Sequence, residues 1–157
     1  HWNRFIRTWA RADQWGFTLV EPGQLPASAE PDTLFRAIAA LPNAGAFWPS
    51  AVAAFPDSGK LWFGYGNSLW NQGQKQKALD AFRNATRKAP DFAAAWNNRA
   101  YAEQALGDDK SARGSICRAH ALAPQDQAIS DSVAELTGQS CSSSADASSA
   151  DGCCAAN

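Results

Sequence analysis

Apolar, small and turn-forming residues recur along 59–126 with a fixed period. Residues of the same kind stand 34 positions apart in two consecutive copies. The matched pairs are Trp62 and Trp96, Gly73 and Gly107, Ala78 and Ala112, Phe82 and Ile116, Ala85 and Ala119, and Pro90 and Pro124. A self-match at this period is typical of an array of helix–turn–helix units. The pattern therefore predicts an all-α protein with two clear repeats, at 59–92 and 93–126, and a function in binding.

A degenerate copy precedes the two clear repeats, over residues 25–58. Asp32 is expected to cap a helix over 32–41, and a second helix is expected over 44–55. Pro49 departs from this pattern, because a proline inside a helix removes a hydrogen bond and usually kinks the helix. The sequence thus predicts a helical hairpin that has lost part of the repeat pattern.

Residues after the second clear copy predict one more helix and then a segment of different composition. Ile129 and Val133 share one helical stripe, and Gly138 follows as a stop signal. A repeat array needs a terminal helix with one polar side, so we expect a capping helix over 127–138. Residues 139–157 consist mainly of Ser, Ala, Asp and Cys and have almost nothing to bury.

The first 24 residues have a pattern of their own. Apolar residues over 5–9 are at helical spacing, whereas those over 15–19 alternate with smaller or more polar residues. We expect a short N-terminal helix and one β-strand in 1–24, followed by a proline-rich linker over 21–31. Because the chain begins at His1 rather than methionine, we expect a mature or truncated form of a longer product.

The first clear repeat resembles the tetratricopeptide repeat at nearly every signature position. These positions are Trp62, Tyr65, Gly66, Leu69, Gly73, Ala78, Phe82, Ala85 and Pro90. Small residues such as Gly66 let two antiparallel helices approach, Gly73 forms the turn, and Pro90 ends the second helix. The resemblance implies a superhelix of antiparallel helix pairs. In the second repeat Arg99 and Glu103 replace large apolar residues, and we expect both at the edge of the packing.

In tetratricopeptide arrays the first helix of each repeat lines a concave groove whose polar side chains bind peptide backbone. The resemblance assigns this role to Lys60, Phe63, Asn67, Trp70 and Asn71 in the first repeat and to Asn97, Asn98, Tyr101 and Gln104 in the second. Asparagine suits the role because its amide is both a donor and an acceptor. The aromatic residues of this set are equally consistent with coverage by the N-terminal helices.

Two of these asparagines, Asn67 and Asn98, match those of the family's carboxylate clamp. The basic partners of that clamp are missing, because Phe63 replaces a lysine, and Ala128 and Ser132 stand where a third repeat would offer lysine and arginine. The resemblance therefore argues against a carboxylate-clamp co-chaperone. It leaves an extended peptide or a partner chain as the expected ligand.

Charge is distributed unevenly along the chain. Residues 60–120 hold ten lysines and arginines against five aspartates and glutamates, whereas the whole chain has a net charge of −1. A basic repeat region between acidic ends fits an acidic peptide partner or the protein's own neighbouring subunit. This excess of charge is too small to indicate nucleic acid. No run of about 18 apolar residues is present, so we expect no membrane span.

The cysteines and histidines form no metal, cofactor or catalytic pattern. The cysteines are Cys117, Cys141, Cys153 and Cys154, without a CxxC pair or a histidine at ligand spacing. Cys117 and His120 stand three residues apart, but no orienting group accompanies them, so we predict no enzyme activity. We expect His120 at the surface near a helix end. The clustering of cysteines near the C-terminus favours an oxidising compartment and a disulfide or an intermolecular crosslink.

Residues 5–26 resemble the closing segment of the papain-like double-glycine peptidase domain found in bacterial envelope proteins with a C-terminal tetratricopeptide module. The matching residues are Phe5, Thr8, Trp9, Arg11, Trp15, Pro22, Gly23, Leu25 and Pro26. In that family the nucleophilic cysteine and the basic histidine lie upstream of this segment, and neither is present here. The resemblance implies a periplasmic or extracellular location in the bacterial envelope.

Three functions are consistent with these patterns. The first is a protein–protein interaction module that binds an extended peptide or partner chain in a concave groove. The second is a self-assembling extracellular or envelope subunit, forming filaments through its termini and cysteines. The third is the non-catalytic C-terminal part of a double-glycine-type cysteine peptidase.

Overall fold

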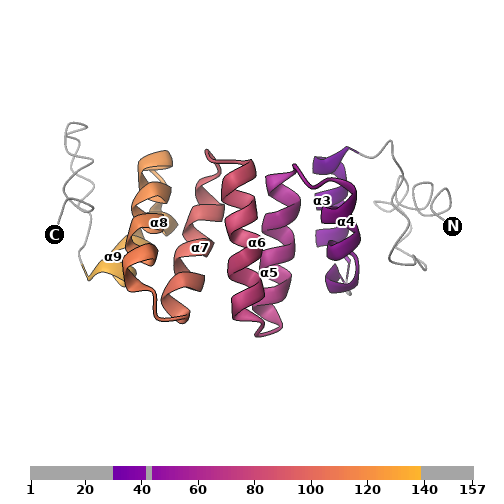
Figure 1. The fold of residues 1–157 in the computed structure, drawn as a ribbon. Coiled ribbons are helices and arrows are strands. Elements are labelled where there is room, and N and C mark those ends of the chain that lie inside the picture. The colour runs from indigo at the N-terminus through magenta and orange to yellow at the C-terminus, as the bar shows by residue number, and fades with distance from the viewer. Residues whose placement is uncertain (1–29, 42–43, 139–157) are drawn as a thin grey trace, which may run out of the picture.

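The computed structural model describes residues 30–41 and 44–138, and these ranges contain helices and turns but no strand. The helices follow one another along the array in chain order, from α3 and α4 at one end to α8 and α9 at the other (Figure 1). Their bounds are α3 (Pro31–Ala39), the 3-10 helix η1 (Ala44–Ala46), α4 (Trp48–Ala54), α5 (Gly59–Asn71), α6 (Lys75–Lys88), α7 (Ala93–Ala105), α8 (Asp109–Leu122) and α9 (Gln127–Thr137). The helical-array prediction is therefore confirmed. The helix and strand expected in 1–24 and the tail over 139–157 lie outside the described residues.

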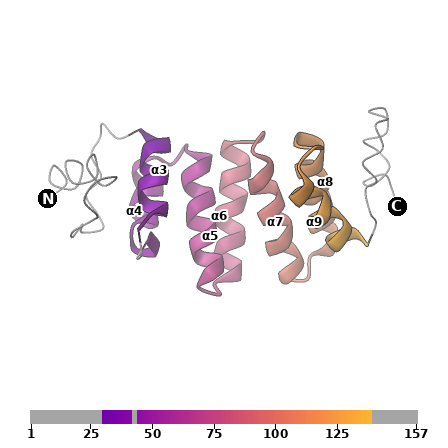
Figure 2. The same cartoon turned by 180° about the vertical axis from the view of Figure 1, so that it is seen from behind.

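Two layers of helices run along the array. Helix α7 is bonded to α5 through Asn98 and Asn67 and to α9 through Tyr101 and Glu135, so α5, α7 and α9 form one layer. Helices α6 and α8 form the other layer, and Figures 1 and 2 show the array from its two opposite sides. We call the solvent-facing side of α5, α7 and α9 the inner face, and that of α6 and α8 the outer face.

A glycine in the left-handed region joins the two helices of each clear repeat. The backbone angle φ is +73° at Gly73 and +82° at Gly107. The N–H group of Gly73 donates to the carbonyl of Trp70, and that of Gly107 donates to the carbonyl of Gln104. Left-handed backbone costs a residue with a Cβ about 1–2 kcal/mol, so glycine is favoured at both turns. The predicted turn positions are confirmed.

Replacing Gly73 by alanine is expected to lower the free energy of unfolding by about 1–2 kcal/mol, measured by urea denaturation with circular dichroism. A Cβ at Gly73 would meet nothing within 4 Å, so the loss reports backbone conformation alone. The matched control is Gly114→Ala inside α8, where the surroundings are equally open and φ is not positive. Alanine there should raise stability by about 0.5–1 kcal/mol. Equal effects at the two positions would contradict this interpretation.

Helix α5 is packed between its neighbours by two aromatic rings that lie on glycine. A Cβ on Gly66 would be 2.5 Å from the ring of Phe82 in α6, and a Cβ on Gly64 would be 2.3 Å from the ring of Trp48 in α4. Both rings are buried, with 1% and 3% of their surface exposed. Burial of a side chain of this size contributes about 1.5–3 kcal/mol. The glycines are therefore required by close packing, as predicted for Gly66.

The repeated tryptophans tie each clear repeat to the loop before it. The indole Nε1–H of Trp62 donates to the carbonyl of Pro56 at 2.8 Å, and that of Trp96 donates to the carbonyl of Pro90 at 3.0 Å. Both tryptophans are half-buried and pack against the core. A tryptophan suits this place because it offers a large apolar surface together with one N–H donor.

The first described helix begins one residue before its predicted cap. Glu30 is the N-cap of α3 and Pro31 is its first residue, whereas Asp32, the expected cap, lies in the first turn. Proline determines this start because its fixed φ fits a helix and its missing N–H is not needed there. Asp32 instead accepts a hydrogen bond from the Lys60 Nζ at 2.6 Å and so joins α3 to α5.

The helix expected over 44–55 is divided in two. Residues Ala44–Ala46 form the 3-10 helix η1, and α4 begins only at Trp48. Pro49 thus stands in the first turn of α4, where a proline is well tolerated, instead of inside a helix. The expected kink is therefore wrong, because Pro49 determines where the helix starts.

Candidate interaction face

A ladder of asparagine amides crosses the inner face from one repeat to the next. Asn98 of α7 donates its Nδ2–H to Oδ1 of Asn67 in α5 at 2.7 Å, and Asn97 donates to Oδ1 of Asn98 at 3.3 Å. All three side chains are half-buried. The structure therefore brings together the three asparagines that the sequence placed in the groove, but it also bonds them to one another.

Hydrogen-bonding capacity remains on this ladder. No described residue accepts from the Nδ2 group of Asn67, and one of the two N–H groups of Asn98 is not used within the ladder. The Oδ1 atom of Asn97 is buried and accepts no hydrogen bond from any described residue. Because a buried acceptor without a partner is costly, this oxygen marks a place where a donor is missing.

The aromatic residues of the predicted groove take part in packing as well as lining the face. The ring of Phe63 lies 4.9 Å from that of Phe92 and 6.3 Å from that of Phe82, measured between centroids. Trp70 is half-buried, and the Nζ of Lys75 lies 5.9 Å from the centre of its ring. A cation over the face of an indole is attracted by the ring's negative face. Phe63 therefore packs against aromatic rings of the array and Trp70 lies against Lys75, and the groove role of both stays a prediction.

Tyr101 connects the inner face to the last described helix. Its hydroxyl donates to Oε2 of Glu135 in α9 at 2.7 Å. Burial raises the pKa of the Tyr101 phenol above its usual range, and the hydrogen bond to Glu135 raises it further. Glu135 was missed in the sequence, although the repeat period could have found it, because it follows Tyr101 by 34 residues.

The remaining predicted groove residues differ in their availability. Lys60 is engaged by Asp32 of α3, so it links helices instead of offering a free cation. Asn71 and Gln104 are exposed, and neither forms a hydrogen bond to a described residue. The predicted set is therefore brought onto one side of the array, but only part of it has free bonding groups.

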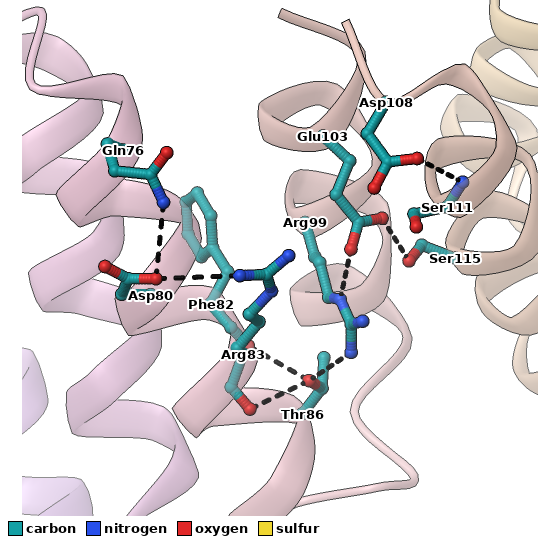
Figure 3. A network of polar contacts seen from close by, with 10 residues as sticks. All are labelled: Gln76, Asp80, Phe82, Arg83, Thr86, Arg99, Glu103, Asp108, Ser111 and Ser115. Atoms are coloured by element: carbon teal, nitrogen blue, oxygen red, sulfur yellow. Dashed lines mark hydrogen bonds and ion pairs between the residues drawn. The ribbon is translucent and has the colours of Figure 1, made fainter. Parts of the chain in front are cut away.

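Arg99 and Glu103 are not at the edge of the packing, and that prediction is wrong. Glu103 has 0% of its surface exposed. Its Oε1 accepts from Arg99 Nε at 2.8 Å, and its Oε2 accepts from Ser115 of α8 at 2.6 Å (Figure 3). Arg99 also donates to the hydroxyl of Thr86 in α6 at 3.3 Å, and its guanidinium stacks on the ring of Trp96.

This polar cluster joins three helices. Thr86 lies on α6, Arg99 and Glu103 lie on α7, and Ser115 lies on α8 (Figure 3). A buried carboxylate is tolerated only when it is paired and hydrogen-bonded, and both of its oxygens are satisfied here. The cluster therefore fixes how the second repeat sits against the first, and it is distinct from the inner-face ladder.

His120 and the cysteines differ in how far the structure describes them. His120, expected at the surface, is half-buried, and its Nδ1 is enclosed without a partner among the described residues. Helix α9 packs against α8 through Ile129 and Val133. Cys117 is half-buried in α8. The other three cysteines lie outside the described residues, so the predicted disulfide or crosslink stays a prediction.

Other kinds of site have little support within the described ranges. No group of three or more metal-binding side chains occurs in them. None of their helices is long and apolar enough to cross a membrane. An open pocket of about 410 Å³ lies at the end of the array formed by α3 and α4. It is lined by Pro31, Ala54, Phe55, Pro56, Asp57 and Ser58. None of the predicted groove residues lines this pocket.

A sequence model of the tetratricopeptide repeat matches residues 36–83 and 63–127. These matches together span more than half of the chain, so the chain belongs to the tetratricopeptide-repeat family. The tetratricopeptide repeat is a non-catalytic helical scaffold fold, and proteins that contain it generally mediate protein–protein interaction. Since the matches begin at residue 36, they do not bear on the peptidase-like resemblance of residues 5–26.

Solved structures of similar fold support the same architecture. The crystal structure of MamA is 18% identical with a TM-score of 0.60, covering 69% of this chain and 67% of that chain. The RS-1 ArsTM double mutant of MamA is 18% identical with a TM-score of 0.62, covering 86% of this chain and 71% of that chain. Similarity at this identity concerns the fold alone. No curated protein matches the chain.

Proposed function

We propose that this chain is a protein–protein interaction module that binds an extended polypeptide along its inner face. The observation that carries the proposal is the asparagine ladder from Asn67 through Asn98 to Asn97, which crosses from α5 to α7. On α5 the ladder has Phe63 one helical turn before it and Trp70 one turn after it, on the same side of the helix. In this arrangement the amides suit the backbone of a bound polypeptide, and the aromatic rings beside them suit its side chains.

The chemistry of the ladder fits main-chain recognition. Its unused Nδ2–H groups are donors, and the buried Asn97 Oδ1 is an acceptor without a partner. An extended polypeptide offers a carbonyl acceptor at every residue, which suits the unused Nδ2–H donors of Asn67 and Asn98. The Asn97 Oδ1 atom is enclosed, so a ligand does not reach it. The concave surface of a helical-repeat array is well placed for such a ligand.

The test uses an array of immobilised peptides of random sequence, probed with the labelled full chain. Asn67→Ala combined with Asn98→Ala should weaken binding to the retained peptides by at least about tenfold, since two hydrogen bonds of about 1 kcal/mol each are lost. The matched control is Asn84→Ala on α6, which removes the same amide from the outer layer. Binding that is unchanged in the double variant, or lost equally in the control, would contradict the proposal.

The expectations from the sequence about the partner's charge, the location and self-assembly stay proposals. An acidic partner is less favoured for the inner face, because the lysines and arginines lie mainly on α6 and α8. A bacterial envelope location is supported by the cysteine content and by the resemblance of residues 5–26. A second candidate function, self-assembly, is favoured by the distribution of charge between the two faces.

A further inference from the structure

The outer face concentrates positive charge. Helices α6 and α8 together contain eight lysines and arginines against two aspartates. Six of these cations are exposed and form no ion pair with any described residue: Lys75, Lys77, Arg87, Lys110, Arg113 and Arg118. The whole chain has a net charge of −1, so the positive charge of this face is a local feature that the overall composition does not explain.

The inner face has the opposite character. Helices α5, α7 and α9 carry two cations, and both are engaged within the chain: Lys60 pairs with Asp32, and Arg99 pairs with Glu103 in the polar cluster. At its C-terminal end α9 carries two exposed carboxylates, Asp131 and Glu135, and neither is in an ion pair with a described residue. Residues 121–138 contain no lysine or arginine that could neutralise them.

We propose that the inner face of one copy docks on the outer face of a second copy, with Asp131 and Glu135 placed against Arg113 and Arg118. The inference rests on the proposed function in that the inner face is again the protein-binding surface, but the occupant is here the folded outer face of a second copy and not an extended polypeptide. Both surfaces belong to this chain, and their charges are complementary without any other molecule. A second copy is therefore the occupant that the charge distribution supports.

The geometry of such a contact has two consequences. Because the two surfaces differ, each contact leaves an inner face free on one copy and an outer face free on the other, so a third copy can add. Exposed ion pairs contribute only about 0.2–1 kcal/mol each and are screened by salt. The association is therefore of low affinity at physiological salt and strengthens as the salt concentration falls.

The test is sedimentation velocity of the full chain with reductant present, at about 50 mM and about 500 mM NaCl, which changes screening strongly. We expect species heavier than the 16.8 kDa monomer at low salt and monomer at high salt. One variant combines Arg113→Glu with Arg118→Glu, and the other combines Asp131→Lys with Glu135→Lys. Each alone should associate at least about tenfold more weakly. The matched control, Arg36→Glu on α3, should behave as the unmodified chain.

Mixing the two charge-reversed variants is the decisive measurement. Their reversed faces are complementary again, so the mixture should form heavier species that neither variant forms alone. A chain that stays monomeric at low salt, or a mixture without rescue, overturns this inference. If such a chain still binds array peptides in a manner that depends on Asn67 and Asn98, the proposed function stands. Association that depends on Arg113 and Arg118 but not on Asp131 and Glu135 overturns the inference and assigns the outer face to another acidic surface.

Discussion

Replacing Glu103 by alanine should lower the free energy of unfolding by about 3 kcal/mol. Removing one member of a buried ion pair costs about 3–5 kcal/mol, and we expect the lower end because the Arg99 side chain keeps 24% of its surface exposed. The loss arises from the unpaired guanidinium and from the hydroxyl of Ser115, whose acceptor disappears. Urea denaturation followed by circular dichroism measures it directly.

Two further variants separate charge from shape at this position. Glu103→Gln keeps the size of the side chain and an acceptor for Ser115, so it should cost less than alanine. Arg99→Tyr combined with Glu103→Leu copies Tyr65 and Leu69, which occupy the equivalent positions of the preceding repeat. This pair should restore most of the stability, because an apolar replacement of a buried ion pair is often neutral. An alanine variant as stable as the parent would show that the cluster does not hold the repeats together.

Replacing Phe82 by alanine should cost about 3–5 kcal/mol, the range for a fully buried phenylalanine. The ring has 1% of its surface exposed and lies against Gly66. Gly66→Ala alone should also destabilise, by about 1–3 kcal/mol, because its Cβ would lie 2.5 Å from that ring. The same urea titration gives both values.

The two substitutions are expected to be non-additive. Once Phe82 is alanine, the Cβ at position 66 no longer meets the ring, and it fills part of the cavity. The double variant should therefore be more stable than the sum of the single losses predicts, by about 1 kcal/mol or more. Strict additivity would mean that the Gly66 backbone and the Phe82 ring do not constrain each other.

The repeat period was enough to predict the array because it reflects packing that every repeat shares. Gly66, Phe82 and Gly73 recur in kind because helices can approach and turn only with those side-chain sizes at those places. The position of Pro49 within its helix was predicted wrongly, because the repeat period placed it inside the helix over 44–55. The preference of proline for the first turn of a helix would have predicted a helix that starts next to Pro49, as observed.

The polar cluster could not be found by the same reasoning. A glutamate in the position of a large apolar residue is consistent with an exposed edge, and only the fold shows that Arg99, Thr86 and Ser115 converge on it. Likewise, the sequence placed Asn67 and Asn98 on one face but could not show that they bond to each other. Both arrangements depend on contacts between residues that are far apart in the sequence.

The most direct test of the central claim is a heteronuclear NMR titration of the full chain with the tightest peptide from the array. The side-chain amide signals of Asn67 and Asn98 and the backbone signals of α5 and α7 should shift as peptide is added, while α6 and α8 stay unchanged on their exposed side. Shifts confined to the outer face, with the signals of Asn67 and Asn98 unmoved, would contradict the assignment of the inner face as the binding surface.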